Sequence, residues 1–102
     1  MLAEYRVRRD FVVRRLRQIP GVTLPEPKGA FYAYPNTSCA MKGGIQSSLD
    51  FADLLLKEEL VAVVPGEAFG TAHHVRISYA TSMHELERGL DRIDRFVRRH
   101  SS

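Results

Sequence analysis

Residues 61–79, VAVVPGEAFGTAHHVRISY, contain two short apolar runs separated by a segment rich in turn-forming residues. The first run, at 61–64, fits a buried strand, and the Pro-Gly pair after it ends the strand because proline lacks an amide donor and glycine tolerates turns. The second run, at 75–80, alternates between large apolar side chains and small or polar ones, which is the period of a strand with one buried face. The stretch therefore predicts two strands joined by a turn.

The second of these strands carries one arginine among small neighbours. If Val75, Ile77 and Tyr79 face a core, Arg76 and Ser78 project from the opposite face. A guanidinium with open space in front of it is suited to bind a carboxylate or a phosphate through two parallel hydrogen bonds. A solvated arginine, or one paired with a nearby glutamate, is the alternative that the residues alone leave open.

The rest of the chain predicts three amphipathic helices and two more strands. Apolar residues recur at three- and four-residue steps in each helix, and aromatic or β-branched runs between turn formers indicate the strands. In chain order we predict a helix at 1–19, strands at 22–24 and 30–34, an exposed, mobile loop at 36–46, a helix from Ser47 or Ser48, strands at 61–64 and 75–80, and a helix at 83–99.

The helices also carry predictions about their starts and faces. The arginines of the first helix are expected to form a solvated face. The last helix is expected to begin at Ser82, with Glu85 completing a capping box, and the middle helix to be capped in the same way by Ser47 and Asp50. The middle helix is expected to bury Leu49, Ala52, Leu55, Leu56 and Leu60 and to turn Lys57, Glu58 and Glu59 toward solvent.

This order of elements predicts a single domain, 1–102, with an α/β (α+β) two-layer sandwich fold. We expect a small mixed sheet of about four strands with three helices packed on one face, in the order α-β-β-α-β-β-α. The other face of the sheet, which would carry Arg76, is left uncovered. A half-covered sheet in so small a domain suggests that it packs against something else.

The composition is that of an ordinary globular chain. Hydrophobic residues make up 44% and charged residues 26%, and the formal net charge of +3 permits a polyanion partner without requiring one. A single cysteine cannot form an internal disulfide, and no apolar run approaches the ~20 residues that span a bilayer. The neighbouring His73 and His74 would point to opposite sides of a strand, a poor arrangement for one metal ion. We therefore expect a soluble cytoplasmic protein without metal or membrane partners. A nucleic-acid partner is not expected either, because Glu4 and Asp10 interrupt the arginines of the first helix.

Three blocks of sequence resemble a known family. They are YRVRRDFVVRRL at 5–16, PKGAFYAYP at 27–35 and VVPGEAFGTAHHVRISYATS at 63–82, and together they extend over nearly the whole chain. They resemble the C-terminal small domain of class I/II aminotransferases, the fold-type I pyridoxal-phosphate enzymes of the aspartate aminotransferase kind. The third block is the specific one, because a Pro-Gly turn, an aromatic, a glycine and then Val-Arg-Ile-Ser-Tyr rarely occur in this order by chance.

The resemblance implies roles for particular residues. Arg76 matches the arginine that binds the α-carboxylate of the substrate. The Gly-Ala-Phe-Tyr strand of the family implies that Phe31 and Tyr32 lie near the substrate entrance and contact the substrate, with Gly29 shaping this part of the site. The turn that leads to the arginine strand would be shaped by Gly66, Phe69 and Gly70, and Ser78 would complete the site on the strand itself.

The resemblance also implies what this chain does not supply. In the family, a lysine forms a Schiff base with pyridoxal 5'-phosphate, and an aspartate contacts the pyridine nitrogen. Lys28, Lys42 and Lys57 fall in a turn, a loop and a charged helix face, so we expect all three on the surface and no catalytic residue in this chain. The implied partners are amino acid and 2-oxo acid substrates, the large cofactor-binding domain of the same enzyme and a second copy in a homodimer. On this reading the fragment alone is inactive.

Two other classes of protein stay open at this point. One is a stand-alone α/β module in which Arg76 holds an amino acid or another small carboxylate without chemistry, with the uncovered sheet face buried in a homodimer. The other is a nucleic-acid-binding domain that uses the basic first helix and binds polyanions with a steep salt dependence. The amino donor is open as well, because the arginine would contact only the carboxylate that all amino acids share.

Overall fold

The computed structural model describes residues 2–24 and 32–101 of the chain. The described residues form three α-helices, three short strands and two 3₁₀ helices. These are α1 (Leu2–Arg17), β1 (Tyr32–Ala33), η1 (Ser38–Ala40), α2 (Ser48–Glu59), β2 (Val64–Pro65), η2 (Gly66–Phe69), β3 (Val75–Ser78) and α3 (Met83–Ser101). The three helices and β3 lie where the sequence predicts them, with β3 shorter than expected. The strand predicted at 61–64 is misplaced, because β2 overlaps it only at Val64 and includes Pro65, which was expected to end it.

The sheet has three strands in the order β1-β3-β2, so the arginine-bearing strand is its centre. Both pairings are antiparallel, with Tyr32 opposite Ser78 on one side and Val64 opposite Arg76 on the other. The predictions of a fourth strand and of a mixed sheet are therefore wrong for the described residues.

The segment at 22–24 joins the sheet only through a single bridge between Thr23 and Asn36. The Thr23 amide donates to the Asn36 carbonyl at 3.4 Å, and the Asn36 amide donates back at 2.8 Å. Pro25 follows in the sequence and has no amide hydrogen with which to continue such a ladder. Among the residues that the structure describes, a fourth strand therefore does not extend beyond this one pair.

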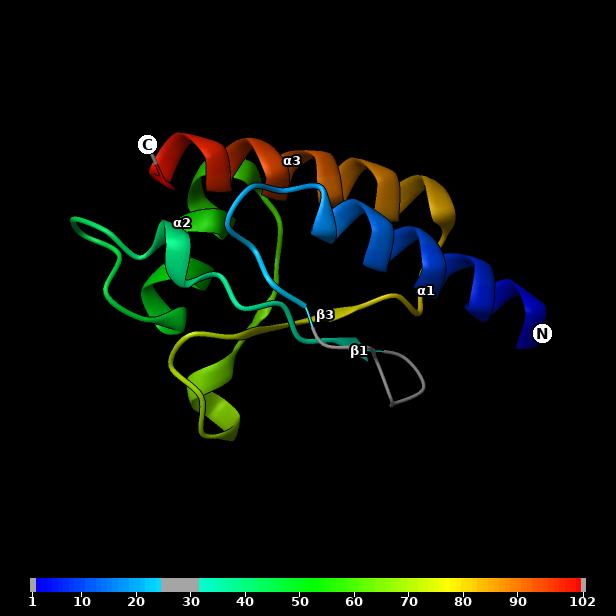
Figure 1. The fold of residues 1–102 in the computed structure, drawn as a ribbon, viewed down its shortest axis with the longest axis horizontal. Helices are drawn as coiled ribbons and strands as arrows, with labels where there is room; N and C mark the ends of the chain where they lie inside the picture. The colour runs from blue at the N-terminus through cyan, green and yellow to red at the C-terminus, as the bar shows by residue number, and fades with distance from the viewer. Residues whose placement is uncertain (1, 25–31, 102) are drawn as a thin grey trace.

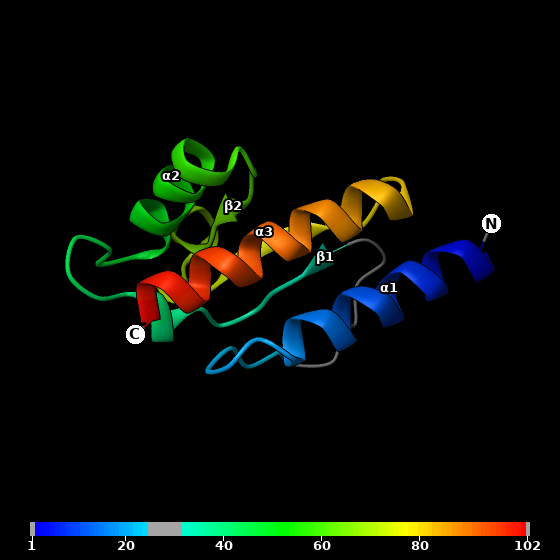
Figure 2. The ribbon, with the colours of Figure 1, turned by 90° about the horizontal axis from the view of Figure 1, so that it is seen from above.

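The helices occupy one side of the sheet, and α1 and α3 lie side by side across it (Figures 1 and 2). The core fills the space between these layers, with Phe51 from α2 meeting Phe96 of α3 edge-on at a ring distance of 5.1 Å. The largest fully buried side chains come from all three helices, from the chain around β3 and from the segments that follow α1 and β1, namely Val12, Leu16, Ile19, Pro35, Thr37, Phe51, Leu55, Val75, Tyr79, Leu90, Phe96 and Val97. The predicted two-layer arrangement with helices on one face is confirmed.

Helix α2 buries only part of the face predicted for it. Ala52 and Leu55 are buried as predicted, and Phe51 is buried beside them. The other predicted core residues, Leu49, Leu56 and Leu60, are 47%, 50% and 76% exposed. The helix carries leucines on two sides, so the leucine pattern alone does not specify its rotation. The bulky ring of Phe51, seated against Phe96, determines which side turns inward.

Glu59, predicted to face solvent, is also on the inner side of α2 and is only 7% exposed. Its carboxylate accepts hydrogen bonds from the guanidinium groups of Arg95 and Arg99 on α3, and Arg92 donates to its backbone carbonyl at 3.2 Å. The hydrogen bond from Arg95, with support from Arg99, holds the pKa of the Glu59 carboxyl below its usual range. A buried carboxylate that is ionised and paired in this way ties the end of α2 to α3.

The first helix is not simply a solvated arginine face. The side chain of Arg15, on α1, faces α3 and donates hydrogen bonds of 2.8 Å to both Asp91 and Asp94 of that helix. These two carboxylates, Asp91 first, raise the pKa of the Arg15 guanidinium above its ordinary value. The spacing of apolar residues along a helix does not reveal charged partners on a neighbouring helix. The sequence pattern therefore assigned Arg15 to the solvated face.

The segment at 36–46 was predicted as an exposed, mobile loop, and that prediction is wrong for part of it. Thr37, Ala40 and Ile45 are buried, and the short helix η1 packs against α3. The apolar side chains of Ala40 and Ile45 anchor the segment to the core.

The predicted start of α3 is confirmed by the Ser82 hydroxyl, which accepts a hydrogen bond from the Glu85 amide at 3.2 Å.

No helix among the described residues combines the length and the apolar character that crossing a membrane would need.

One backbone position is strained and offers a stability test. Leu60, which caps α2, has φ 58 and ψ 35, a left-handed conformation in which a Cβ is unfavourable. Because its side chain is 76% exposed, little burial is lost on truncation. Leu60→Gly should therefore raise the free energy of unfolding by about 1 kcal/mol, measured as the midpoint of urea denaturation of the protein.

The matched control is Leu56→Gly, one turn earlier on the same exposed side of α2. Its backbone is helical, so glycine there should lower stability by about 1 kcal/mol. A loss of stability in both variants would show that Leu60 contributes through its side chain and not through backbone strain.

Candidate functional site

The candidate site is centred on Arg76 in β3. Along this strand Val75, Ile77 and Tyr79 are buried, while Arg76 is half-buried and Ser78 is exposed. The predicted alternation is confirmed, and it places Arg76 on the sheet face that α1 and α3 do not cover (Figure 1). The central position of β3 fixes the backbone of Arg76 from both sides.

The strand register determines the neighbours of Arg76 on this face. Val64 of β2 lies directly opposite it, and Tyr32 of β1 lies diagonally across, because Tyr32 pairs with Ser78. The guanidinium carbon of Arg76 is 4.4 Å from the centroid of the Tyr32 ring, within the range of a cation–π contact. Arg76 therefore stands between an aromatic ring and a branched apolar side chain.

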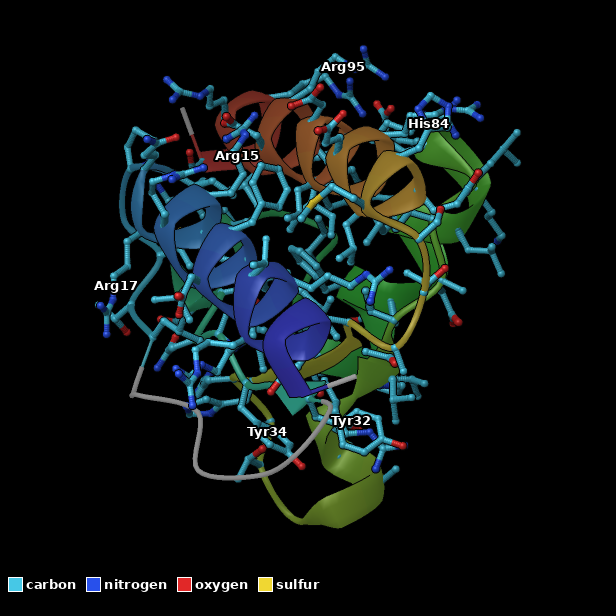
Figure 3. The ribbon with its side chains drawn as sticks, turned by 90° about the vertical axis from the view of Figure 1, so that its right-hand side faces the viewer. Arg15, Arg17, Tyr32, Tyr34, His84 and Arg95 are labelled. Atoms are coloured by element: carbon cyan, nitrogen blue, oxygen red, sulfur yellow. The ribbon has the colours of Figure 1, made fainter. Side chains whose placement is uncertain are left out.

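Ser78 keeps this face open. It is two residues from Arg76 on the same side of β3, and its small side chain is exposed. The Ser78 hydroxyl accepts a hydrogen bond from the Ala80 amide at 3.2 Å, so it stabilises the turn of the backbone just after β3. Figure 3 shows Tyr32 and Tyr34 projecting on the same side of the sheet, away from α1 and α3.

The turn that leads into β3 is held by backbone contacts at Gly66. Its amide donates to the His74 carbonyl at 2.8 Å, and its carbonyl accepts from the Thr71 amide at 2.8 Å. A Cβ at this position would lie 2.2 Å from the Thr71 carbonyl oxygen and 2.3 Å from that of His74, so only glycine fits. Gly70, with φ +97, adopts a conformation that side chains disfavour, and Phe69 is the last residue of η2.

Two polar residues that sequence reasoning missed attach this turn to α2. The Ser48 hydroxyl accepts a hydrogen bond from the Glu67 amide at 3.1 Å, and Glu67 Oε1 accepts one from the Leu49 amide at 3.2 Å. Hydrogen bonds from Ser47 and from the Leu49 amide keep the pKa of the Glu67 carboxyl below its usual range. The predicted Ser47 cap forms no side-chain hydrogen bond of its own to the helix, because Glu67 caps α2 across the turn. A cap supplied by a residue 18 positions later has no local signal in the sequence.

The other predicted site residues fall in two groups. Gly29 and Phe31 lie outside the described residues, so the structure says nothing of their predicted place at the substrate entrance. Tyr32, Gly66, Gly70 and Ser78 all lie on β3, next to it, or in the turn that leads to it. The structure thus gathers the described members of the predicted set around one strand.

The described lysines do not fit a role in holding an aldehyde cofactor. Lys42 and Lys57 are both exposed, and Lys42 Nζ donates a hydrogen bond of 2.8 Å to the Ser101 carbonyl. An amine that forms an imine with a cofactor needs apolar surroundings, and both of these lysines are exposed to solvent. Lys28 lies outside the described residues.

Within the described part of the chain, no three His, Cys, Asp or Glu side chains gather in a way that could hold a metal ion.

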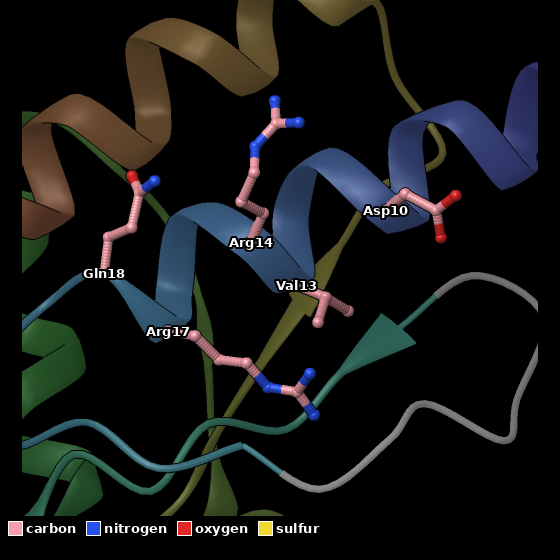
Figure 4. A pocket seen from close by; sticks show the side chains of 5 residues that line it. All are labelled: Asp10, Val13, Arg14, Arg17 and Gln18. Carbon is pink, nitrogen blue, oxygen red and sulfur yellow. The ribbon is translucent and has the colours of Figure 1, made fainter.

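A surface hollow on α1 is separate from this site (Figure 4). It has a volume of about 430 Å³ and is lined by Asp10, Val13, Arg14, Arg17 and Gln18. The side chains of Arg14 and Arg17 extend in different directions in this view, and Arg17 donates a hydrogen bond to the Leu24 carbonyl at 3.3 Å. None of the lining residues belongs to the sheet, so the hollow does not extend the Arg76 site.

Comparison with known proteins gives consistent matches over nearly the whole chain. The chain is 44% identical over 95 residues to aspartate aminotransferase of Bacillus subtilis, which is 92% of this chain and 24% of that protein. The crystal structure of an aromatic aminotransferase from Pyrococcus horikoshii superposes with a TM-score of 0.85 at 41% identity, covering 95% of this chain and 25% of that one. The Thermus thermophilus aspartate aminotransferase with maleate gives a TM-score of 0.79 at 39% identity, covering 90% of this chain and 22% of that one.

The chain thus spans about a quarter of the length of the relatives it matches. The family model for class I and II aminotransferases matches residues 1–93, which include all the described residues of the Arg76 site. The chain belongs to the class I and II aminotransferase family.

Proposed function

We propose that this chain forms the substrate-carboxylate-binding part of a pyridoxal-phosphate-dependent aminotransferase, an enzyme that transfers an amino group between an amino acid and a 2-oxo acid. The observation that carries the proposal is Arg76, held on the central strand of a sheet whose face around it is not covered by helices α1 and α3. A guanidinium is permanently charged and matches a carboxylate with two parallel N–H donors.

One arginine can serve both substrates. An amino acid and a 2-oxo acid share the α-carboxylate and differ at the neighbouring carbon, so a group that binds only the carboxylate holds donor and acceptor in the same place. Because β3 is paired on both edges, the guanidinium is presented from a rigid support, which favours precise positioning of the carbon that reacts.

Membership of the family implies dependence on pyridoxal phosphate. When bound, this cofactor supplies the electron sink for amino-group transfer. The described lysines are exposed, so the proposal assigns cofactor binding to the rest of the enzyme and to this chain the binding of substrate and the closing of the site against water.

The proposal leaves the amino donor open. The relatives are named for aspartate and for aromatic amino acids, and Arg76 addresses what those substrates have in common. The Thermus thermophilus relative was solved with maleate, a dicarboxylate, which supports carboxylates as the class of ligand. The homodimer remains a prediction that rests on the family resemblance, and the cytoplasmic location remains one that rests on the composition.

The test is an assay of the full-length enzyme that contains this chain. With pyridoxal phosphate and 2-oxoglutarate present, we expect amino-group transfer from aspartate, phenylalanine or both. The matched control donor is 2-phenylethylamine, which has the side chain of phenylalanine and no α-carboxylate and should react far more slowly than phenylalanine. Equal rates for these two donors, or no transfer from any amino acid, would contradict the proposal.

A further inference from the structure

We propose that Tyr32 is a positioning residue that holds the guanidinium of Arg76 ready for the substrate carboxylate, and that it acts through its ring and not through its hydroxyl. This inference rests on the proposed function of Arg76. It differs from the prediction made from sequence, in which Tyr32 itself lies against the substrate.

The geometry of the sheet brings the two side chains together. Tyr32 pairs with Ser78, and Arg76 precedes Ser78 by two residues on the same face, so the Tyr32 ring and the guanidinium are diagonal neighbours. The ring centroid lies 4.4 Å from the guanidinium carbon. Ser78, the direct partner of Tyr32, is small and exposed, which leaves the ring room to lean toward Arg76.

The ring suits this role because an arginine side chain is long and flexible. Four rotatable bonds allow the guanidinium many positions, and fixing one of them at the moment of binding costs side-chain entropy. A ring at cation–π distance restricts the guanidinium before the substrate arrives, and it uses no N–H donor in doing so.

The opposite side of Arg76 is bounded as well. Val64 of β2 faces Arg76 directly across the sheet and offers no polar atom on its side chain. An apolar neighbour on one side and an aromatic ring on the other favour one orientation of the guanidinium. Tyr32 is 37% exposed, so its side chain lies at the surface where a ligand would approach. Its hydroxyl could therefore contact the ligand directly, and the experiment must separate the hydroxyl from the ring.

The experiment compares Tyr32→Phe and Tyr32→Leu in the full-length enzyme loaded with its cofactor. The dissociation constant for maleate is measured by isothermal titration calorimetry, and kcat and KM are measured with the preferred amino acid. Tyr32→Phe keeps the ring and should change the maleate affinity less than twofold. Tyr32→Leu should weaken it about 3- to 30-fold, the range of a cation–π contact, and should act mainly on KM. Thermal unfolding of each variant checks that the fold is retained.

A second background shows whether Tyr32 acts through Arg76. In Arg76→Leu there is no cation to position, so adding Tyr32→Leu should cause no further loss of kcat/KM. An equal loss in both backgrounds would overturn the inference, as would a loss in Tyr32→Phe as large as in Tyr32→Leu, which would assign the effect to the hydroxyl. If Arg76→Leu alone leaves kcat/KM unchanged, the proposed function of Arg76 fails. If Arg76→Leu weakens binding and Tyr32→Leu does not, only the role of Tyr32 fails.

Discussion

Arg76→Ala in the full-length enzyme should lower kcat/KM for amino acids about 10²- to 10³-fold, because a desolvated, hydrogen-bonded charge pair costs about 2–5 kcal/mol when one partner is removed. The affinity for pyridoxal phosphate should change by less than about threefold, since the described residues around Arg76 include no lysine. The two quantities are measured by steady-state kinetics and by titration of the cofactor-free enzyme.

The expected loss follows from the environment of the guanidinium. Arg76 is half-buried on a central strand, between Tyr32 and Val64. Water that enters the space left by alanine would not replace the positive charge of the guanidinium. The carboxylate of the substrate would then lose both its hydrogen bonds and its counter-charge. The loss should appear as a higher KM and, since a poorly held substrate is also poorly oriented, as a lower kcat.

Arg76→Lys is the matched control for charge without the planar fork. Lysine keeps the positive charge but cannot form two parallel hydrogen bonds, so it should recover part of the loss and not all of it. Near-normal kcat/KM in Arg76→Ala at low substrate concentration would show that another residue binds the carboxylate. A loss of cofactor affinity as large as the loss of kcat/KM would place Arg76 at the cofactor.

The arrangement around Arg76 was predictable because it follows from a strong local period. Burial alternates along β3 as the sequence indicates, so the side of the sheet that carries Arg76 is set by two-residue steps alone. The contact with Tyr32 could not be predicted in the same way. It depends on the register of β1 against β3, which pairs Tyr32 with Ser78 across 46 positions of sequence, 78 minus 32. No local pattern specifies that register.

The errors on α2 have the same origin. Leucines on two sides of the helix gave the sequence no unique inner face, and the partner that decides it, Phe96, lies on another helix. Glu59 was assigned to solvent because a glutamate in a charged run is ordinarily exposed. Its burial is tolerated only because Arg95 and Arg99, 36 and 40 positions later, supply charge and hydrogen bonds. Distant charge partners of this kind are a property of the folded chain.

Gly66→Ala should be the most destabilising of the glycine substitutions in the described chain, with a loss of about 3 kcal/mol in the free energy of unfolding. The added Cβ would lie 2.2 Å from the Thr71 carbonyl oxygen and 2.3 Å from the His74 carbonyl oxygen. Both atoms belong to the backbone, so neither can rotate away. Urea denaturation measures the effect, and Gly44→Ala is the control, because a Cβ there meets no atom within 4 Å and stability should change by less than about 0.5 kcal/mol.

The same substitution should also damage the site, because one of the two clashing atoms helps to hold the turn together. The His74 carbonyl oxygen accepts the hydrogen bond from the Gly66 amide, so relieving the clash requires breaking a hydrogen bond that fixes the entry to β3. Arg76 is two residues beyond His74 and would move with that entry. At a temperature where the Gly66→Ala enzyme is still folded, KM for the amino acid should therefore rise while Gly44→Ala stays normal. A stable Gly66→Ala enzyme with unchanged KM would mean that the turn can relax without disturbing β3, and that Gly66 does not determine where Arg76 lies.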